Sequence, residues 1–158
     1  VQDEVLHQLI STAAKTEIGL KNDFDSIKNY TDFRDRIPLV SYEDIEPQIQ
    51  RCRNGEQNIF WPTSITWFAK SSGTSNAKSK FIPISNESLE DCHYKAGKDM
   101  LSIYYNNHEN AQILAGKCLR LGGSSELYQN TDSYFGDLSA IIIDNLAFWD
   151  ELGSTPML

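Results

Sequence analysis

The chain has 158 residues, 40% of them apolar, and its 14 basic and 22 acidic side chains give a formal net charge of −8. That length and apolar content predict one domain with a sizeable core and exclude a disordered chain. The acidic balance argues against binding to nucleic-acid phosphates or anionic lipid, and no apolar run approaches the ~20 residues of a membrane span.

Apolar residues recur at helical spacing over residues 3–20, which predicts one helix with a single buried face that ends near Gly19. That face consists of Val5, Leu6, Leu9, Ile10, Ala13 and Ala14. Residues 21–36 are polar and predict a loop followed by a short helix. Pro38 then imposes an extended turn.

The segment Ser41-Tyr42-Glu43-Asp44 is typical of a helix start. A serine oxygen can accept a hydrogen bond from an unpaired backbone N–H group, and acidic residues in the first turn complement the helix dipole. We therefore interpret Glu43, Asp44 and Glu46 as charges of a helix start. Gly55 supplies the stop. The apolar face of this helix consists of Tyr42, Ile45, Ile49 and Cys52.

From Ile59 to Lys70 the apolar spacing becomes alternating, which favours a strand covered on both faces. Residues 81–84 predict a short return strand. Pro83 should lie at an edge or at a strand end, because proline has no N–H group for a central ladder.

Helices and short strands alternate through the rest of the chain. Ser85 or Asn86 can cap a long helix, and Gly136-Asp137 introduces another that runs toward Trp149, with Asp137 as its cap. The apolar face of the long helix consists of Leu89, Cys92, His93, Ala96, Met100, Ile103 and Tyr104. Short strands are predicted at 113–114 and 118–121, with a turn at 122–125. The interleaving predicts an α/β class, with helices packed on a mixed, short-stranded sheet.

The cysteines and the chain ends carry weaker signals. Three scattered cysteines, Cys52, Cys92 and Cys118, suit a reducing compartment better than a disulfide framework, which predicts a cytoplasmic protein. The chain starts inside a helical pattern at Val1 and stops at Leu158 without a clear ending. We therefore expect a piece of a longer protein.

The segment FAKSSGTSNAKSKFIP (68–83) gathers small hydroxyl residues and lysines in an otherwise acidic chain. No aspartate or glutamate occurs from Gln57 to Asn86. A glycine in a tight turn lets several backbone N–H groups point into a concave nest that binds anions. Hydroxyl groups and a lysine ammonium add hydrogen bonds to phosphate oxygens. The segment therefore indicates an anion site suited to a triphosphate.

Other interpretations of the segment remain open or fail. The same residues are ordinary turn residues, so the alternative is a noncatalytic binding or scaffold module with a plain hairpin turn. A standard P-loop is excluded because no second glycine lies between Gly73 and Lys78. The chain has no Gly-x-Ser-x-Gly elbow of a serine hydrolase and no Cys-x-x-Cys or His-x-x-x-His pair of a metal site.

The segment resembles the phosphate-binding signature of the adenylate-forming enzymes, which include acyl-CoA ligases and firefly luciferase. Here the signature is Ser71-Ser72-Gly73-Thr74-Ser75, with Lys80 five residues on, while Asn76 and Ala77 stand where most of the superfamily has a second glycine. Its neighbours resemble the auxin-responsive acyl-acid amido synthetases, most closely their bacterial relatives. The matching stretches are IPLVSYEDIEPQIQRCRNGE (37–56), ITWFAKSSGTS (65–75), KFIPIS (80–85) and GDLSAIII (136–143).

The resemblance implies that residues 1–158 are the N-terminal part of an adenylate-forming domain, with a helical entry segment (1–56) and a phosphate-binding part (57–158). It implies an ATP-dependent ligase that uses Mg²⁺, activates a small carboxylic acid as an acyl-adenylate and conjugates it to an amine or amino acid. The family's adenine, ribose and metal motifs lie beyond this chain, so the chain alone is expected to be inactive and its catalytic residues stay unassigned. The residues implied to hold the ATP phosphates are Ser71, Ser72, Gly73, Thr74, Ser75 and Lys80.

Overall fold

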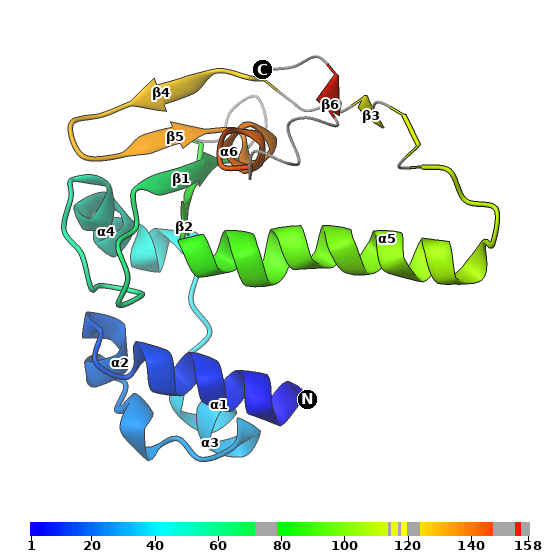
Figure 1. The fold of residues 1–158 in the computed structure, drawn as a ribbon. Helices are drawn as coiled ribbons and strands as arrows, with labels where there is room; N and C mark the ends of the chain where they lie inside the picture. Colours follow the sequence, from blue (N-terminus) through cyan, green and yellow to red (C-terminus); the bar gives the residue numbers. More distant parts are fainter. Residues whose placement is uncertain (72–78, 114, 117, 120–123, 147–153, 156–158) are drawn as a thin grey trace.

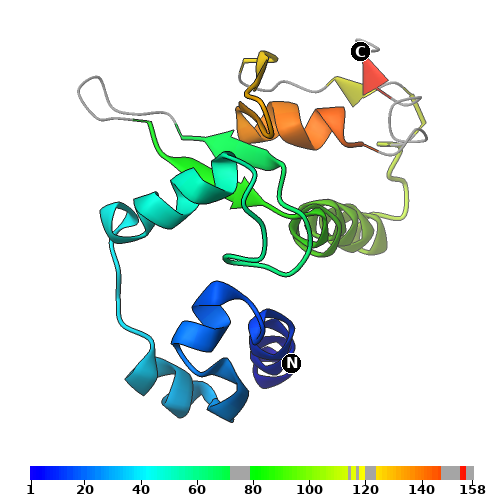
Figure 2. The ribbon, with the colours of Figure 1, turned by 90° about the vertical axis from the view of Figure 1, so that its left-hand side faces the viewer.

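A computed structural model describes residues 1–71, 79–113, 115–116, 118–119, 124–146 and 154–155. The N-terminal helices form one layer, and a part built on a small sheet lies above it in Figure 1. A single extended segment before α4 joins the two (Figure 2). In chain order the elements are α1 (Gln2–Ala13), α2 (Glu17–Lys21), η1 (Phe24–Ser26), α3 (Tyr30–Arg36), α4 (Tyr42–Arg53), β1 (Trp67–Lys70), β2 (Phe81–Ile84), η2 (Ser88–Tyr94), α5 (Lys95–Asn107), β3 (Cys118–Leu119), β4 (Leu127–Gln129), β5 (Tyr134–Gly136), α6 (Leu138–Asp144) and β6 (Ser154–Thr155).

The helix predicted over residues 3–20 is broken at Thr16, so the prediction of one helix is wrong. The Thr16 hydroxyl donates to the Ala13 carbonyl (2.7 Å) and accepts the Gly19 N–H group (3.1 Å), which caps α2. Gly19 is required here, because a Cβ atom at this position would lie 2.0 Å from the Ala13 oxygen. The predicted buried face is confirmed at Ile10, Ala13 and Ala14 and is wrong at Val5 and Leu9, which are exposed.

Helix α4 begins and ends as the sequence predicts. The Asp44 carboxylate accepts the Ser41 N–H group at 2.7 Å, and Gly55 after the helix has a φ of +94°. The positive φ costs glycine little, which explains the stop. Ile49 and Cys52 face the core, together with Ile59, Ile65 and Phe68.

The strand predicted from Ile59 to Lys70 is confirmed only at β1. Before β1, Ile59 and Ile65 are buried in the core without strand pairing, and at Ile65 a side chain takes the place of a neighbouring strand. The Gln57 amide accepts the Ile65 N–H group (2.8 Å) and donates to the Ile65 carbonyl (3.2 Å). An alternating apolar pattern therefore marks burial here rather than an extended ladder.

Among the described residues, four strands form the main sheet in the order β2-β1-β5-β4. β1 is antiparallel to β2 and parallel to β5, and β4 is antiparallel to β5. Phe68 faces the α4 side, while Ala69 packs with Ile84 and with Ile141 of α6, so α4 and α6 cover opposite faces. Pro83 lies in the edge strand β2, as predicted. The observed class is the predicted mixed α/β one.

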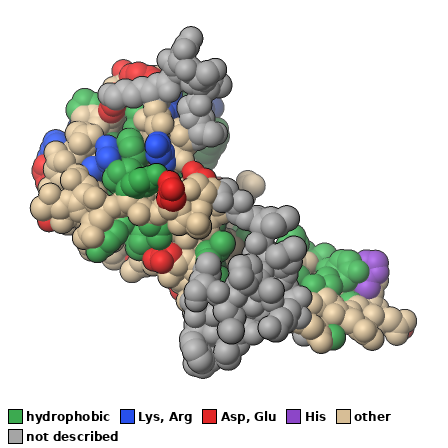
Figure 3. All heavy atoms as spheres, turned by 90° about the horizontal axis from the view of Figure 1, so that it is seen from above, with side chains coloured by type: hydrophobic (Ala, Val, Ile, Leu, Met, Phe, Trp, Pro, Cys, Tyr) green, Lys and Arg blue, Asp and Glu red, His purple; other side chains and the backbone are tan. Residues whose placement is uncertain are grey.

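The long helix predicted after Ser85 is present as η2 followed by α5, and the Ser85 hydroxyl accepts the Ser88 N–H group at 3.1 Å. Its apolar face is buried at Leu89 but not along α5, where Met100 is 65% and Ile103 61% exposed. α5 projects from the sheet (Figure 1), and hydrophobic side chains lie at the surface of this arm (Figure 3). Periodicity thus predicted the helix correctly and the burial of its C-terminal half wrongly.

Weaker predictions fare unevenly. Ile113 lies in a turn, so the strand predicted at 113–114 is wrong at this residue, and β3 confirms the strand predicted at 118–121 only for residues 118–119. Residues 114 and 120–123 lie outside the described ranges. The short strands β4 and β5 were not predicted. Within the described part of the chain, no helix is long and apolar enough to cross a membrane.

Candidate functional site

The segment 71–80 joins β1 to β2 and leaves the sheet at the carboxyl end of β1. Because β1 and β5 are parallel, with Ala69 opposite Gly136, the carboxyl end of β5 lies at the same edge. Asp137 therefore follows directly beside the start of the segment. Ligands of open α/β sheets bind at such carboxyl edges.

Two residues at the ends of the segment, Ser71 and Lys80, hold each other. The Ser71 N–H group donates to the Lys80 carbonyl (2.9 Å), and the Lys80 N–H group donates to the Ser71 hydroxyl (3.1 Å). The Ser71 N–H group thus extends the hairpin by one pair and is already hydrogen-bonded within the protein. The Ser71 hydroxyl keeps its own hydrogen for donation.

The Lys80 side chain lies against the start of α4. Its Nζ atom is 3.2 Å from Glu43 Oε1 and 5.0 Å from the centre of the Tyr42 ring. The Tyr42 hydroxyl accepts the Phe81 N–H group at 2.9 Å. The pKa of the Glu43 carboxyl is lowered, first by a hydrogen bond from its own backbone N–H group and next by Lys80.

Glu43 occupies the helix start that the sequence predicts, but its contact with Lys80 went unpredicted. The two residues are far apart in the sequence, and no spacing rule joins a helix start to the end of a hairpin loop. The pair is 46% (Lys80) and 66% (Glu43) exposed, so the ammonium group remains accessible to an anion from solvent.

A second cation lies next to the first residue of β2. The guanidinium carbon of Arg53 is 3.6 Å from the centre of the Phe81 ring and 5.3 Å from that of Phe135. Burial lowers the pKa of Arg53, although an arginine keeps its charge at neutral pH. Positive charge therefore flanks β2 at Lys80 and Arg53.

At the end of β5, on the same edge of the sheet, Asp137 forms a hydrogen bond with another segment of the chain. It is the N-cap residue of α6, as predicted, but its carboxylate accepts the Ser124 N–H group (2.8 Å) rather than an amide of α6. Gly136 before it lets β4 approach, since a Cβ atom would lie 2.8 Å from the Glu126 oxygen. Asp137 therefore fixes the backbone at Ser124 beside the edge.

The remaining predicted site residues, Ser72, Gly73, Thr74 and Ser75, lie outside the described residues. Of the predicted phosphate site, the structure thus places Ser71 and Lys80, and it brings these two together. No group of three or more His, Cys, Asp or Glu side chains that could hold a metal ion occurs within the described ranges.

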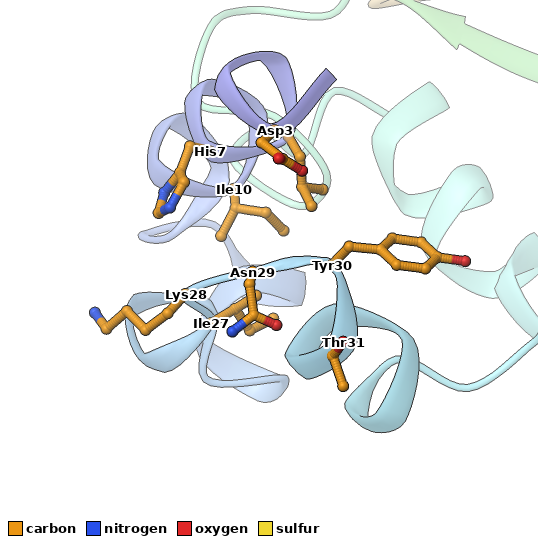
Figure 4. A pocket seen from close by; sticks show the side chains of 9 residues that line it. Asp3, His7, Ile10, Ile27, Lys28, Asn29, Tyr30 and Thr31 are labelled. Atoms are coloured by element: carbon orange, nitrogen blue, oxygen red, sulfur yellow. The ribbon is translucent and has the colours of Figure 1, made fainter. Parts of the chain in front are cut away.

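A separate hollow of about 330 Å³ lies in the N-terminal layer, between α1 and the segment that leads into α3. Figure 4 shows Asp3, His7 and Ile10 on its α1 side and Lys28 and Asn29 opposite. It contains none of the predicted site residues.

Several plant enzymes are similar to part of this chain. The indole-3-acetic acid-amido synthetase GH3.2 of Arabidopsis thaliana is 36% identical over 91 residues, which cover 57% of this chain and 17% of that protein. The 4-substituted benzoates-glutamate ligase GH3.12 of the same plant is 36% identical over 92 residues, covering 58% of this chain and 16% of that enzyme. The matched region thus corresponds to about a sixth of these relatives' length.

The fold and the family follow from two further comparisons. The solved structure of the AtGH3.15 acyl acid amido synthetase in complex with 2,4-DB superposes with a TM-score of 0.75 at 24% identity, over 90% of this chain and 25% of that one. A sequence profile of the GH3 family N-terminal domain matches residues 1–157. The chain belongs to the GH3 family and corresponds to its N-terminal domain.

Proposed function

We propose that this chain is the N-terminal part of an ATP-dependent acyl-acid amido synthetase and carries its loop for the ATP phosphates. Membership of the GH3 family supports the reaction class, and the names of the relatives give substrates of the expected kind. The observation that carries the proposal is the place of Lys80. Its accessible ammonium group lies at the end of the serine-rich segment that contains Gly73, at the carboxyl edge of the sheet.

The proposed reaction has two steps. The carboxylate of the acid attacks the α-phosphate of ATP, which forms an acyl-adenylate and releases pyrophosphate. The amine then attacks the acyl carbonyl, which forms the amide and releases AMP. The proposed substrates are a small carboxylic acid and an amine or amino acid.

The proposed role of the segment 71–80 is to hold the β- and γ-phosphates while pyrophosphate departs. Hydroxyl groups of Ser71, Ser72, Thr74 and Ser75, with backbone N–H groups around Gly73, would donate hydrogen bonds. Lys80 would offset the negative charge that the leaving pyrophosphate gains. Mg²⁺ would arrive with the triphosphate, and no metal ligand is assigned to this chain.

Within this proposal, residues 1–56 form the helical entry segment and residues 57–158 the phosphate-binding part. A cytoplasmic location and a bacterial source stay predictions from the sequence; the relatives described above are plant proteins.

The alternative is a noncatalytic binding or scaffold module. The pairing of the Ser71 amide with the Lys80 carbonyl favours it, because this bond is typical of a simple hairpin. In such a module Lys80 would not bind the phosphates of ATP.

Lys80→Ala in a full-length enzyme that carries this chain separates the two candidates. Loss of one charged hydrogen-bond donor should lower kcat/KM for ATP by about 10- to 100-fold, measured as pyrophosphate release. Lys98→Ala, at an exposed lysine of α5, is the matched control and should leave kcat/KM within twofold. Unchanged ATP kinetics in Lys80→Ala would refute the proposed role.

A further inference from the structure

The first turn of α4 holds the end of the phosphate segment through two adjacent residues. The Tyr42 hydroxyl accepts the Phe81 N–H group, and the Tyr42 ring lies beside the Lys80 ammonium group. The carboxylate of Glu43, the residue after Tyr42, binds the same ammonium group. Helix α4 thus contacts both the backbone at Phe81 and the side chain of Lys80, at the C-terminal end of the segment 71–80.

Lys80 is consequently fixed at two points. Its backbone is bonded to Ser71 through both the N–H and the carbonyl group. Its Nζ atom is bound by Glu43 at 3.2 Å. A long side chain that is already held loses less rotamer freedom when an anion binds, so the interaction with the anion is stronger.

Glu43 itself stands on a firmly anchored helix. Asp44 closes the first turn by accepting the Ser41 N–H group. Further along α4, Ile49 and Cys52 are buried in the core, and Arg51 forms an ion pair with Glu17. A carboxylate on such a helix can set the position of its partner, which a carboxylate on a loose segment cannot do.

We propose that Glu43 is a positioning residue for Lys80 and holds its ammonium group where it meets the ATP phosphates. This role depends on the ATP site proposed above. An ammonium group has three N–H donors, so two remain for phosphate oxygens while one is bound to Glu43. The same device operates in protein kinases, where a glutamate on a helix pairs with the lysine that contacts the nucleotide phosphates.

The test is Glu43→Gln in the full-length enzyme, since glutamine keeps the shape of the side chain and removes its charge. The KM for ATP should rise about two- to fivefold, the range expected for an exposed ion pair, while kcat and the KM for the acid stay within twofold. Glu90→Gln, an exposed glutamate of η2, is the matched control and should change none of these values. Equal melting temperatures of the variants exclude a folding defect as the cause.

A double-mutant cycle shows whether Glu43 acts through Lys80. In the Lys80→Ala background, Glu43→Gln should leave the KM for ATP unchanged, because the group that it positions is gone. An equal rise in both backgrounds would overturn the inference, as would an unchanged or lower KM in the single variant. If Lys80→Ala raises the KM and Glu43→Gln does not, only this inference fails; if Lys80→Ala has no effect, the ATP site itself fails.

Discussion

Ala69 of β1 lies in parallel register opposite Gly136 of β5, and this pair decides where the candidate site is. It sets the start of the segment 71–80 and the carboxylate of Asp137 at one edge of the sheet. Gly136 also lets β4 approach β5 closely. Substitutions at these positions therefore test both the fold and the placement of the candidate site.

Gly136→Ala is expected to destabilise the protein by about 1–3 kcal/mol, because the added methyl group would overlap the Glu126 carbonyl and the Leu127 side chain. Gly97→Ala in α5 is the matched control. Its new Cβ atom meets nothing within 4 Å, so it should be neutral or stabilise by up to about 1 kcal/mol. Urea unfolding measures both values. Equal stability of the two variants would contradict the close approach of the strands.

Thr16→Val should cost about 1–2 kcal/mol, because it removes the cap of α2 and leaves the Gly19 N–H group without its side-chain acceptor. Thr31→Val, at an exposed position in α3, should change stability by less than about 0.5 kcal/mol. Urea unfolding of both variants is the measurement. A neutral Thr16→Val would mean that the helix runs on through this residue.

Acid should weaken the link between the N-terminal layer and α4. Arg51 donates to the Glu17 carboxylate at 2.9 and 2.7 Å and from its Nε atom to Glu56 at 2.7 Å. These bonds lower the pKa of both carboxyls below the ordinary 4.5. Because the folded-state pKa is lowered, the stabilisation is present above pH 4.5 and is lost as the pH falls through the lowered values.

Arg51→Gln should therefore lower the urea midpoint at neutral pH and reduce its fall between about pH 5 and pH 3. Arg34→Gln serves as control, since the ion pair of Arg34 is with its exposed neighbour Asp35. It should keep the pH dependence of the parent protein. An unchanged pH profile in Arg51→Gln would show that this cluster does not stabilise the fold.

The isolated 158-residue chain is expected to form no amide from an acid, an amine and ATP. The matched relatives are about six times as long as the region that this chain covers. From the family resemblance, the adenine and metal motifs are expected outside residues 1–158. Product analysis by mass spectrometry is the measurement. Turnover by the isolated chain would place the whole catalytic machinery within these residues.

Local signals predicted the helix starts and ends well. The Ser41-to-Asp44 start and the Gly55 stop of α4 depend on neighbours in the sequence, and the structure confirms both. The break at Thr16 follows the same rule, since a threonine before Glu17 is a recognisable cap, and the apolar periodicity obscured it.

Features that depend on distant residues could not be predicted. β4 and β5 are too short to show alternation, and their pairing with β1 is a tertiary contact. The ion pair between Glu43 and Lys80 is of the same kind. The apolar stripe of α5 identified the helix, but no sequence pattern shows whether another element covers it.

Hydrogen–deuterium exchange of the full-length enzyme tests the central claim most directly. With Mg-ATP or pyrophosphate, peptides that span residues 71–80 should exchange more slowly, while peptides from α1 stay unchanged, and Lys80→Ala should weaken the protection. Unaltered exchange in residues 71–80 while the enzyme turns over ATP would contradict a triphosphate site in this segment.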